Sequence, residues 1–303
     1  MEARSWRVLV TGAGGFFGRR IVGHLLERGH RVHAHYRTLE SDAAVPVARL
    51  QVQAGNLCAG LDLPEGLDLV IHAAAAGQLG LGTADCLTDN LDTTRAVLAA
   101  VLSRRVPRLL FLSSMAAIGY GDGPVVDETS GVVNPHAYGM AKRLCECLFE
   151  DSAEHLQTLI LRLPNVLGRG CREHFVSEVF KRLRRHQPVT AFNPDRPFNS
   201  IIHVDDLCRF VGSVIDQGWS KTELLCLGSA EPLTIAAVID RLAQSCASCS
   251  PVTWASAPRP SYLISTRRAE AGYGYRPEPV AVALDRYTQE ELTIPIYTDG
   301  LGR

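Results

Sequence analysis

Short apolar runs and amphipathic runs alternate along the first 165 residues. Residues 7–10 are largely apolar, residues 19–28 repeat apolar side chains at helical spacing, and residues 31–35 alternate apolar with polar side chains. These patterns predict a strand, a helix and a second strand in that order. Strands that alternate with helices favour a parallel sheet covered on both faces, with ligands at the carboxyl ends of the strands. Further strands are predicted at residues 67–71, 109–112 and 158–163, and further helices at about residues 93–103 and 137–154.

The regular alternation loosens after residue 168. Prolines become frequent there, and helices are predicted at about residues 173–185 and 233–244. We therefore expect an α/β protein with a doubly wound parallel sheet in residues 1–165. Residues 166–303 are expected to form mainly a smaller, substrate-binding C-terminal lobe, with the chain crossing between the two parts.

A glycine-rich segment, TGAGGFFG at residues 11–18, stands directly after a predicted strand and directly before a predicted helix. Glycines at this spacing allow a tight turn and let the pyrophosphate of a dinucleotide approach the exposed amides of the helix N-terminus. The alternative is a glycine-rich turn that binds no ligand, and the position between strand and helix argues against it. We therefore predict a Rossmann fold whose dinucleotide is bound by Gly12, Gly15, Phe16, Phe17 and Gly18.

The end of the second strand distinguishes the two nicotinamide dinucleotides. An NAD site carries Asp or Glu there for the ribose 2′-hydroxyl, whereas an NADP site carries Arg for the 2′-phosphate. This sequence has Arg37 at that place and no acidic residue before Glu40. A guanidinium pairs with a phosphate dianion through two charge-assisted hydrogen bonds. Arg37 therefore favours NADP(H), with NAD(H) as the alternative, and Arg19 or Arg20 is a further candidate for the phosphate.

A tyrosine and a lysine, Tyr138 and Lys142, stand four residues apart in a predicted helix. This spacing puts both side chains on one face at adjacent turns. A nearby cation favours the phenolate, so the phenol can exchange a proton with a substrate hydroxyl or carbonyl. Lys142 is also expected to hold the nicotinamide ribose. The alternative is a surface tyrosine that stacks on a lysine stem.

Further motifs follow in order: GNL at residues 55–57, HAAA at 72–75, SS at 113–114 and LRLPNVLG at 161–168. With TGAGGFFG and YGMAK, they make the sequence resemble the NAD-dependent epimerase/dehydratase family of extended short-chain dehydrogenases/reductases over nearly the whole chain. It is similar to nucleotide-sugar epimerases and 4-ketoreductases. The resemblance implies that Asn56 and Leu57 flank the adenine, that Ala73, Ala74 and Ala75 border the dinucleotide with Asn90 beneath it, that Pro164 approaches the nicotinamide, and that Asn165 approaches the substrate.

One departure from the family concerns the residue that hydrogen-bonds the reacting oxygen. The family uses a Ser or Thr, usually the third member of a Ser-Ser-Ser/Thr run, and alignment of Ser113 and Ser114 puts Met115 at that place. A thioether cannot donate this hydrogen bond. Either Ser114 takes the role after a local shift, which the apparent extra residue in GYG at residues 119–121 permits, or Tyr138 binds the oxygen unaided. We favour Ser114 as the third catalytic residue.

A second departure lies at Asn199, where relatives carry an arginine that grips the nucleotide diphosphate. Arg196 is close enough in sequence to substitute for it, and Arg259 resembles the family's second phosphate-binding arginine. The alternative for both is an exposed loop arginine. His203 and Asp205, in the same region, are expected to support the backbone of the second lobe rather than to bind a metal.

Composition narrows the remaining functions. The 303 residues include 31 basic and 32 acidic side chains, so no overall field attracts nucleic acid or an anionic membrane. Cys246 and Cys249 form a lone CxxC without a second ligand pair, so we expect no metal site. The nine cysteines do not form a disulfide framework of the kind found in small secreted domains. The first apolar run begins near the initial Met, and no run is long enough to cross a bilayer. We expect a cytoplasmic protein with a small-molecule substrate.

Taken together, these features predict an NADP(H)-dependent ketoreductase that acts on a carbonyl or secondary alcohol of a nucleotide sugar, with Tyr138 as general acid/base. Two alternatives stay open: a nucleotide-sugar epimerase with tightly bound NAD, and a dinucleotide-binding protein without chemistry, which Met115 suggests. A 4,6-dehydratase fits least, because Ala116 and Ala117 stand where dehydratases have a Thr-Asp-Glu run. The resemblance also suggests a homodimer through the helices near Thr93 and Tyr138.

Overall fold

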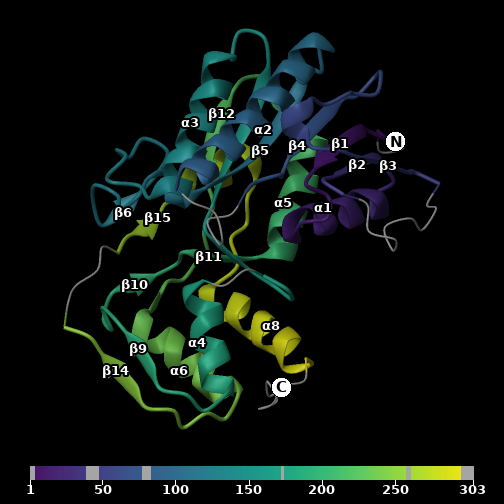
Figure 1. The fold of residues 1–303 in the computed structure, drawn as a ribbon. Helices are drawn as coiled ribbons and strands as arrows, with labels where there is room; N and C mark the ends of the chain where they lie inside the picture. Colours follow the sequence, from purple (N-terminus) through teal and green to yellow (C-terminus); the bar gives the residue numbers. More distant parts are fainter. Residues whose placement is uncertain (1–3, 39–47, 77–82, 172–173, 257–260, 295–303) are drawn as a thin grey trace.

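The computed structural model describes residues 4–38, 48–76, 83–171, 174–256 and 261–294. Within these residues, a seven-stranded parallel sheet has the order β3-β2-β1-β4-β5-β7-β12, which confirms the predicted doubly wound α/β fold (Figure 1). The order reverses between β1 and β4, the point at which such sheets bind their ligands. The strands are β1 (Arg7–Thr11), β2 (Arg31–Tyr36), β3 (Leu50–Ala54), β4 (Leu69–His72), β5 (Arg108–Ser114), β7 (Gln157–Leu163) and β12 (Glu223–Cys226).

Both faces of the sheet are buried, because successive residues of a strand point to opposite sides. Val8 and Val10 of β1 belong to one apolar cluster and Leu9 belongs to another. Figure 1 shows α1 beside α5, and α2 beside α3. The helices of the first cluster are α1 (Phe16–Glu27), α5 (Val204–Gln217) and α7 (Arg267–Tyr273), and those of the second are α2 (Thr83–Ser103) and α3 (Ala137–Asp151).

A smaller part with its own apolar cluster lies beyond the carboxyl end of the sheet, in the lower half of Figure 1. Its helices are α4 (Phe175–Arg184), α6 (Ile235–Ser245) and α8 (Val280–Leu292). Short strand pairs complete it: β8 (Asn165–Leu167) with β11 (Ile201–His203), β9 (Val189–Ala191) with β14 (Val252–Trp254), and β10 (Pro197–Phe198) with β13 (Leu233–Thr234). Between the two parts, β6 (Val125–Val126) pairs with β15 (Leu263–Ile264). In the larger part, short 3₁₀ turns follow β3 at η1 (Leu57–Ala59) and β5 at η2 (Met115–Ala117).

Several elements differ from the expectations. The helix expected at about residues 93–103 begins ten residues earlier, at Thr83, and α5 and α8 were not predicted as helices. α5 lies late in the sequence but packs on α1, and β12 joins the edge of the main sheet beside β7. The C-terminal half of the chain therefore supplies two helices, α5 and α7, and the strand β12 to the larger part. None of the helices in the described ranges is long and apolar enough to span a membrane.

Candidate active site

The glycine turn lies between β1 and α1, where the strand order reverses. Gly12 has φ +69°, and a Cβ added there would come within 2.7 Å of Ala74 Cα. Glycine therefore allows the turn to touch the segment that follows β4. α1 starts after Gly15 with neither a side-chain cap nor an acidic residue in its first turn. Its first amides can therefore donate hydrogen bonds to an anionic pyrophosphate, so this turn fits a dinucleotide.

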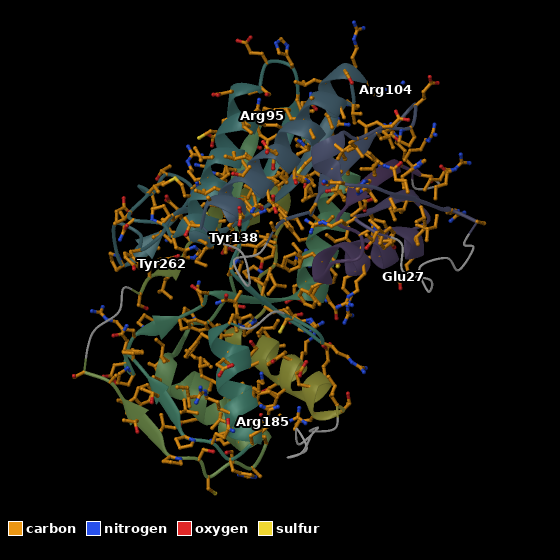
Figure 2. The ribbon with its side chains drawn as sticks, in the orientation of Figure 1. Glu27, Arg95, Arg104, Tyr138, Arg185 and Tyr262 are labelled. Carbon is orange, nitrogen blue, oxygen red and sulfur yellow. The ribbon has the colours of Figure 1, made fainter. Side chains whose placement is uncertain are left out.

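A cavity of about 590 Å³ opens at the carboxyl ends of β1, β4, β5 and β7, within the size range of small-molecule sites. Figure 2 shows Tyr138 at the level where the larger and smaller parts of the molecule meet. Twelve predicted residues line the cavity: Gly12, Gly15, Phe16, Phe17, Gly18, Ala73, Ala75, Ser114, Tyr138, Lys142, Pro164 and Asn165. Five further lining residues were not predicted: Leu112, Ser113, Leu163, Val166 and His174.

The phenol and the ammonium come from the first two turns of α3. Lys142 is 3% exposed, and its Nζ donates to the Leu112 carbonyl over 2.8 Å. The same Nζ lies 4.6 Å from the centre of the Phe111 ring and 5.8 Å from that of Tyr138. A Cβ at Gly139 would lie 2.1 Å from the Ala116 carbonyl oxygen, so only glycine lets α3 approach η2 this closely. The backbone of β5 thus holds the cation beside the tyrosine.

His72, at the end of β4, is a further titratable group, close enough to Lys142 to feel its charge. Its Nδ1 lies 2.8 Å from Thr11 Oγ1 and its Nε2 lies 3.1 Å from Thr94 Oγ1. Burial and the charge of Lys142 lower the pKa of His72 to about 3. The imidazole is therefore neutral near pH 7, and it links β1, β4 and α2 without adding charge to the site.

Ser114 and Met115 occupy different surroundings. Ser114 lines the cavity, and its Oγ accepts a hydrogen bond from the Ala116 amide over 3.1 Å. A hydroxyl that accepts this bond retains a proton to donate. Met115 is buried in a separate apolar cluster that includes Ile118 and Val126. Of the two residues, Ser114 is the one that a bound carbonyl oxygen in the cavity can reach.

The neighbouring Ser113 is held by an ion pair that sequence reasoning missed. Its Oγ donates to Glu146 Oε1 over 2.5 Å, and Glu146 accepts from Arg162 Nε and Nη2 over 3.0 and 2.8 Å. Glu146 is fully buried and lies one helical turn after Lys142. That spacing is the only sequence signal that pointed to it. The carboxylate joins α3, β5 and β7, and each of these elements carries residues of the cavity.

The residues expected around the adenine and the ribose lie nearby but do not all line the cavity. Asn90 is buried and donates to the carbonyls of Ala76 and Cys86, so it supports the segment after β4. Asn56 caps η1, where Leu57 is buried. Ala74 donates its amide to Thr11 Oγ1. Arg37 is exposed, one residue beyond β2 and close in space to the glycine turn, because Tyr36 lies beside Gly14.

The expected phosphate-binding arginines are not part of the described cavity. Arg196 is exposed in the loop between β9 and β10, and Arg259 lies outside the described residues. Asn199 is buried: its Nδ2 donates to the carbonyls of Ser229 and Ile264, and its Oδ1 accepts from the Ile264 amide. It ties the end of β10 to β15. An arginine at this position would break those bonds.

Two histidines, His174 and His203, cap helices. Burial lowers the pKa of His174 to about 4, and this residue caps α4. His203 lies 3.2 Å from Glu290 and 3.5 Å from Asp205, and it caps α5 through the Asp205 amide. Arg286 donates to Asp205 over 2.8 Å, so this carboxylate is already paired with a guanidinium.

The chain matches one protein-family model and several named proteins. A model of the NAD dependent epimerase/dehydratase family matches residues 8–224. A UDP-2-acetamido-2,6-beta-L-arabino-hexul-4-ose reductase from Pseudomonas aeruginosa is 30% identical over 224 residues, which are 69% of this chain but only 50% of the reductase. A UDP-glucose 4-epimerase from Corynebacterium glutamicum is 27% identical over 301 residues, 90% of this chain and 91% of the epimerase.

A solved structure supports the fold over almost the full length. The Bordetella bronchiseptica enzyme WbmG in complex with NAD superposes with a TM-score of 0.81 and 20% identity, covering 96% of this chain and 95% of WbmG. At this identity the likeness bears on the fold alone. The cavity, the glycine turn and the Tyr138–Lys142 pair thus lie on the same architecture as in an NAD-binding enzyme.

Proposed function

The chain belongs to the NAD-dependent epimerase/dehydratase family, and from this premise we propose that it is an NADP(H)-dependent ketoreductase of nucleotide sugars. The observation that carries the proposal is the grouping of Tyr138, Lys142 and Ser114 in one cavity with the glycine turn. A phenol, a buried ammonium and a hydroxyl together serve proton transfer to a carbonyl oxygen.

The reaction divides between cofactor and protein. A bound nicotinamide dinucleotide supplies the hydride. Ser114 and Tyr138 hydrogen-bond the carbonyl oxygen, and Tyr138 delivers its hydroxyl proton to that oxygen as negative charge develops. Lys142, held by the Leu112 carbonyl, stabilises the phenolate that remains. Asn165, at the cavity wall, orients the sugar.

Arg37 supports the choice of NADP(H). It is exposed one residue beyond β2, where its guanidinium can pair with a 2′-phosphate without giving up a buried partner. An acidic residue at this place would instead favour the 2′-hydroxyl of NAD. WbmG was solved with NAD, but its 20% identity does not transfer a cofactor preference to this chain.

The substrate class rests on the relatives. The Pseudomonas relative is named as a reductase of a UDP-linked hexulose, and the Corynebacterium relative as an epimerase of UDP-glucose. We assign the diphosphate contacts to Arg196 and Arg259, because Asn199 is occupied by backbone groups. The smaller part of the molecule is then the substrate-binding lobe.

A nucleotide-sugar epimerase is the second candidate. One observation favours it: the Corynebacterium epimerase aligns with 90% of this chain, whereas the Pseudomonas reductase aligns with 69%. An epimerase returns the same hydride to its substrate, so it retains its dinucleotide through purification. Denaturing extraction of the purified protein therefore distinguishes the two candidate functions, because recovery of a retained NAD favours the epimerase.

The cofactor choice is tested by the dissociation constants for NADPH and NADH, measured by fluorescence titration. We expect tighter binding of NADPH in the unmodified protein and a loss of about 10- to 100-fold in NADPH affinity for Arg37→Ala, with NADH affinity unchanged. Arg31→Ala is the matched control, because Arg31 is also exposed but begins β2 at the end away from the glycine turn. Equal affinity for NADPH and NADH in the unmodified protein would contradict the assignment of NADP(H) as the cofactor.

A further inference from the structure

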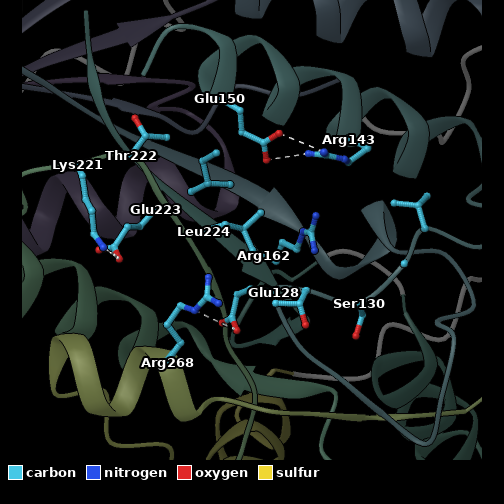
Figure 3. Close-up of a pocket in the computed structure, with 14 residues that line it drawn as sticks. Glu128, Ser130, Arg143, Glu150, Arg162, Lys221, Thr222, Glu223, Leu224 and Arg268 are labelled. Atoms are coloured by element: carbon cyan, nitrogen blue, oxygen red, sulfur yellow. Dashed lines mark hydrogen bonds and ion pairs between the residues drawn. The ribbon is translucent and has the colours of Figure 1, made fainter. Parts of the chain in front are cut away.

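A second cavity, of about 570 Å³, has Arg162 of the Glu146–Arg162 pair among its lining residues (Figure 3). Its walls come from the loop at residues 128–132, from α3, from β7, from the start of β12 and from α7. None of its lining residues lines the active-site cavity. Its volume falls within the range of small-molecule sites, so it is large enough for a ligand of its own.

Arg162 projects a buried guanidinium into the wall of this cavity. The residue is 3% exposed, and two of its three nitrogens, Nε and Nη2, donate to Glu146. The third nitrogen, Nη1, is buried and has no hydrogen-bond partner among the described residues. A buried charged donor without an acceptor costs free energy. An acceptor bound in the cavity would remove that cost.

Three further cations line the same cavity: Arg143, Lys221 and Arg268. Figure 3 shows each of them paired with a carboxylate: Arg143 with Glu150, Lys221 with Glu223, and Arg268 with Glu128. The pair of Arg268 is loose at 3.7 Å, and Lys221 is largely exposed. With Arg162 on Glu146, each of these four cations has a carboxylate partner, so the donor that remains for a further anion in the described lining is Arg162 Nη1.

We propose that this cavity is a binding site for an oxyanion, a phosphate or carboxylate group of a small molecule. Arg162 Nη1 donates to the oxyanion from the cavity floor, and Arg268 contacts it from the rim. Guanidinium groups suit this ligand because their fixed N–H geometry matches two oxygens of one anion.

The site is placed to influence catalysis. Arg162 directly precedes Leu163, Pro164 and Asn165, which line the active-site cavity. Its partner Glu146 also holds Ser113, the neighbour of Ser114. A bound oxyanion therefore contacts a guanidinium whose carboxylate partner also holds Ser113, next to Ser114.

The test is isothermal titration of the full chain with inorganic phosphate and, separately, with succinate, at constant ionic strength set with chloride. Saturating dinucleotide is present, so that the glycine turn cannot bind the probe. We expect saturable binding of at least one probe and a loss of about tenfold or more in affinity for Arg268→Gln. Arg162→Gln is expected to abolish binding. The probe that binds distinguishes a phosphate site from a carboxylate site.

Arg104→Gln is the matched control, because Arg104 and Arg268 are both 45% exposed and each pairs with a single carboxylate. This control is expected to bind the probe as the unmodified protein does. Absence of saturable binding of both probes overturns the proposal, as does equal affinity in the Arg268→Gln and Arg104→Gln variants. If Arg162→Gln does not fold, the comparison of Arg268→Gln with Arg104→Gln still tests whether the oxyanion binds in this cavity.

Discussion

Ser114 and Met115 are adjacent in sequence, but the end of β5 directs them to different surroundings. Ser114 lines the active-site cavity beside Tyr138, whereas Met115 packs in an apolar cluster with Ile118. The methionine at the family's usual Ser/Thr position therefore fills a core site. It does not block the cavity, and the hydroxyl one position earlier is available for the carbonyl oxygen.

Removal of this hydroxyl gives the first prediction. Ser114→Ala is expected to lower kcat roughly 10²-fold, because one hydrogen bond to the developing oxyanion is lost. Met115→Leu conserves apolar volume and is expected to leave kcat within about twofold. Steady-state kinetics of both variants are the measurement. A large loss of kcat in Met115→Leu with full activity in Ser114→Ala would show that Ser114 is not the residue that hydrogen-bonds the carbonyl oxygen.

The buried His72 predicts a pH dependence of stability. Its folded-state pKa is lowered from 6.5 to about 3 by burial and by Lys142, so the unfolded chain binds a proton that the folded chain excludes. The stabilisation is present above pH 6.5 and is lost progressively as the pH falls toward 3. Between these values His72 alone contributes a slope of up to about 1.4 kcal/mol per pH unit.

Urea unfolding at pH 7 and pH 5 measures this slope. The free energy of unfolding is expected to be lower at pH 5 than at pH 7. His72→Gln keeps a polar side chain near Thr11 and Thr94 but does not titrate, so this variant is expected to show a smaller difference between the two pH values. Other buried histidines, including His174, contribute in the same direction and remain in the variant. An unchanged slope in His72→Gln would show that this imidazole does not exclude a proton.

At the scale of elements, the Glu146 carboxylate joins three segments that build the site. It accepts from Ser113 of β5 and from Arg162 of β7, and it lies on α3 one turn after Lys142. Sequence patterns predicted all three elements, because their apolar periodicities are local. They could not predict this junction, since its partners are 16 and 33 residues apart and meet only when the strands are paired.

Glu146→Gln tests the junction. Loss of a buried carboxylate that faces a buried guanidinium is expected to lower the free energy of unfolding by about 3 kcal/mol. Glu150→Gln is the control: Glu150 pairs with Arg143 on the exposed side of the same helix, so its loss is expected to cost less than about 1 kcal/mol. Chemical denaturation of both variants gives the two values. Equal stability of the two variants would mean that the junction contributes no more than a surface ion pair.

α5 and α8 show why other elements were missed. α5 is rich in apolar positions, which its burial against α1 and the sheet explains, but it stands in a region where prolines and loops weaken the periodic signal. α8 has a weaker amphipathic pattern and packs against α6 in the smaller part. The boundaries of both helices depend on tertiary packing rather than on local sequence.

At the scale of the whole molecule, the parallel sheet brings two local motifs to one cavity. TGAGGFFG and YGMAK are more than 100 residues apart in sequence, and residues of both line the cavity at the carboxyl ends of the strands. The role of Asn199 could not be predicted in this way. Its position suggested a missing phosphate anchor, whereas its hydrogen bonds to Ser229 and Ile264 make it a support between β10 and β15.

The proposed activity, reduction of the carbonyl of a nucleotide sugar with Tyr138 delivering the proton, needs the whole molecule. The most direct test supplies a UDP-4-keto-sugar with NADPH in which both nicotinamide C4 hydrogens are replaced by deuterium, followed by mass spectrometry of the product. We expect a reduced sugar nucleotide that carries one deuterium, formed roughly 10²-fold or more slowly by Tyr138→Phe. Unlabelled inversion of a UDP-sugar by retained NAD, without consumption of NADPH, would contradict it and identify an epimerase.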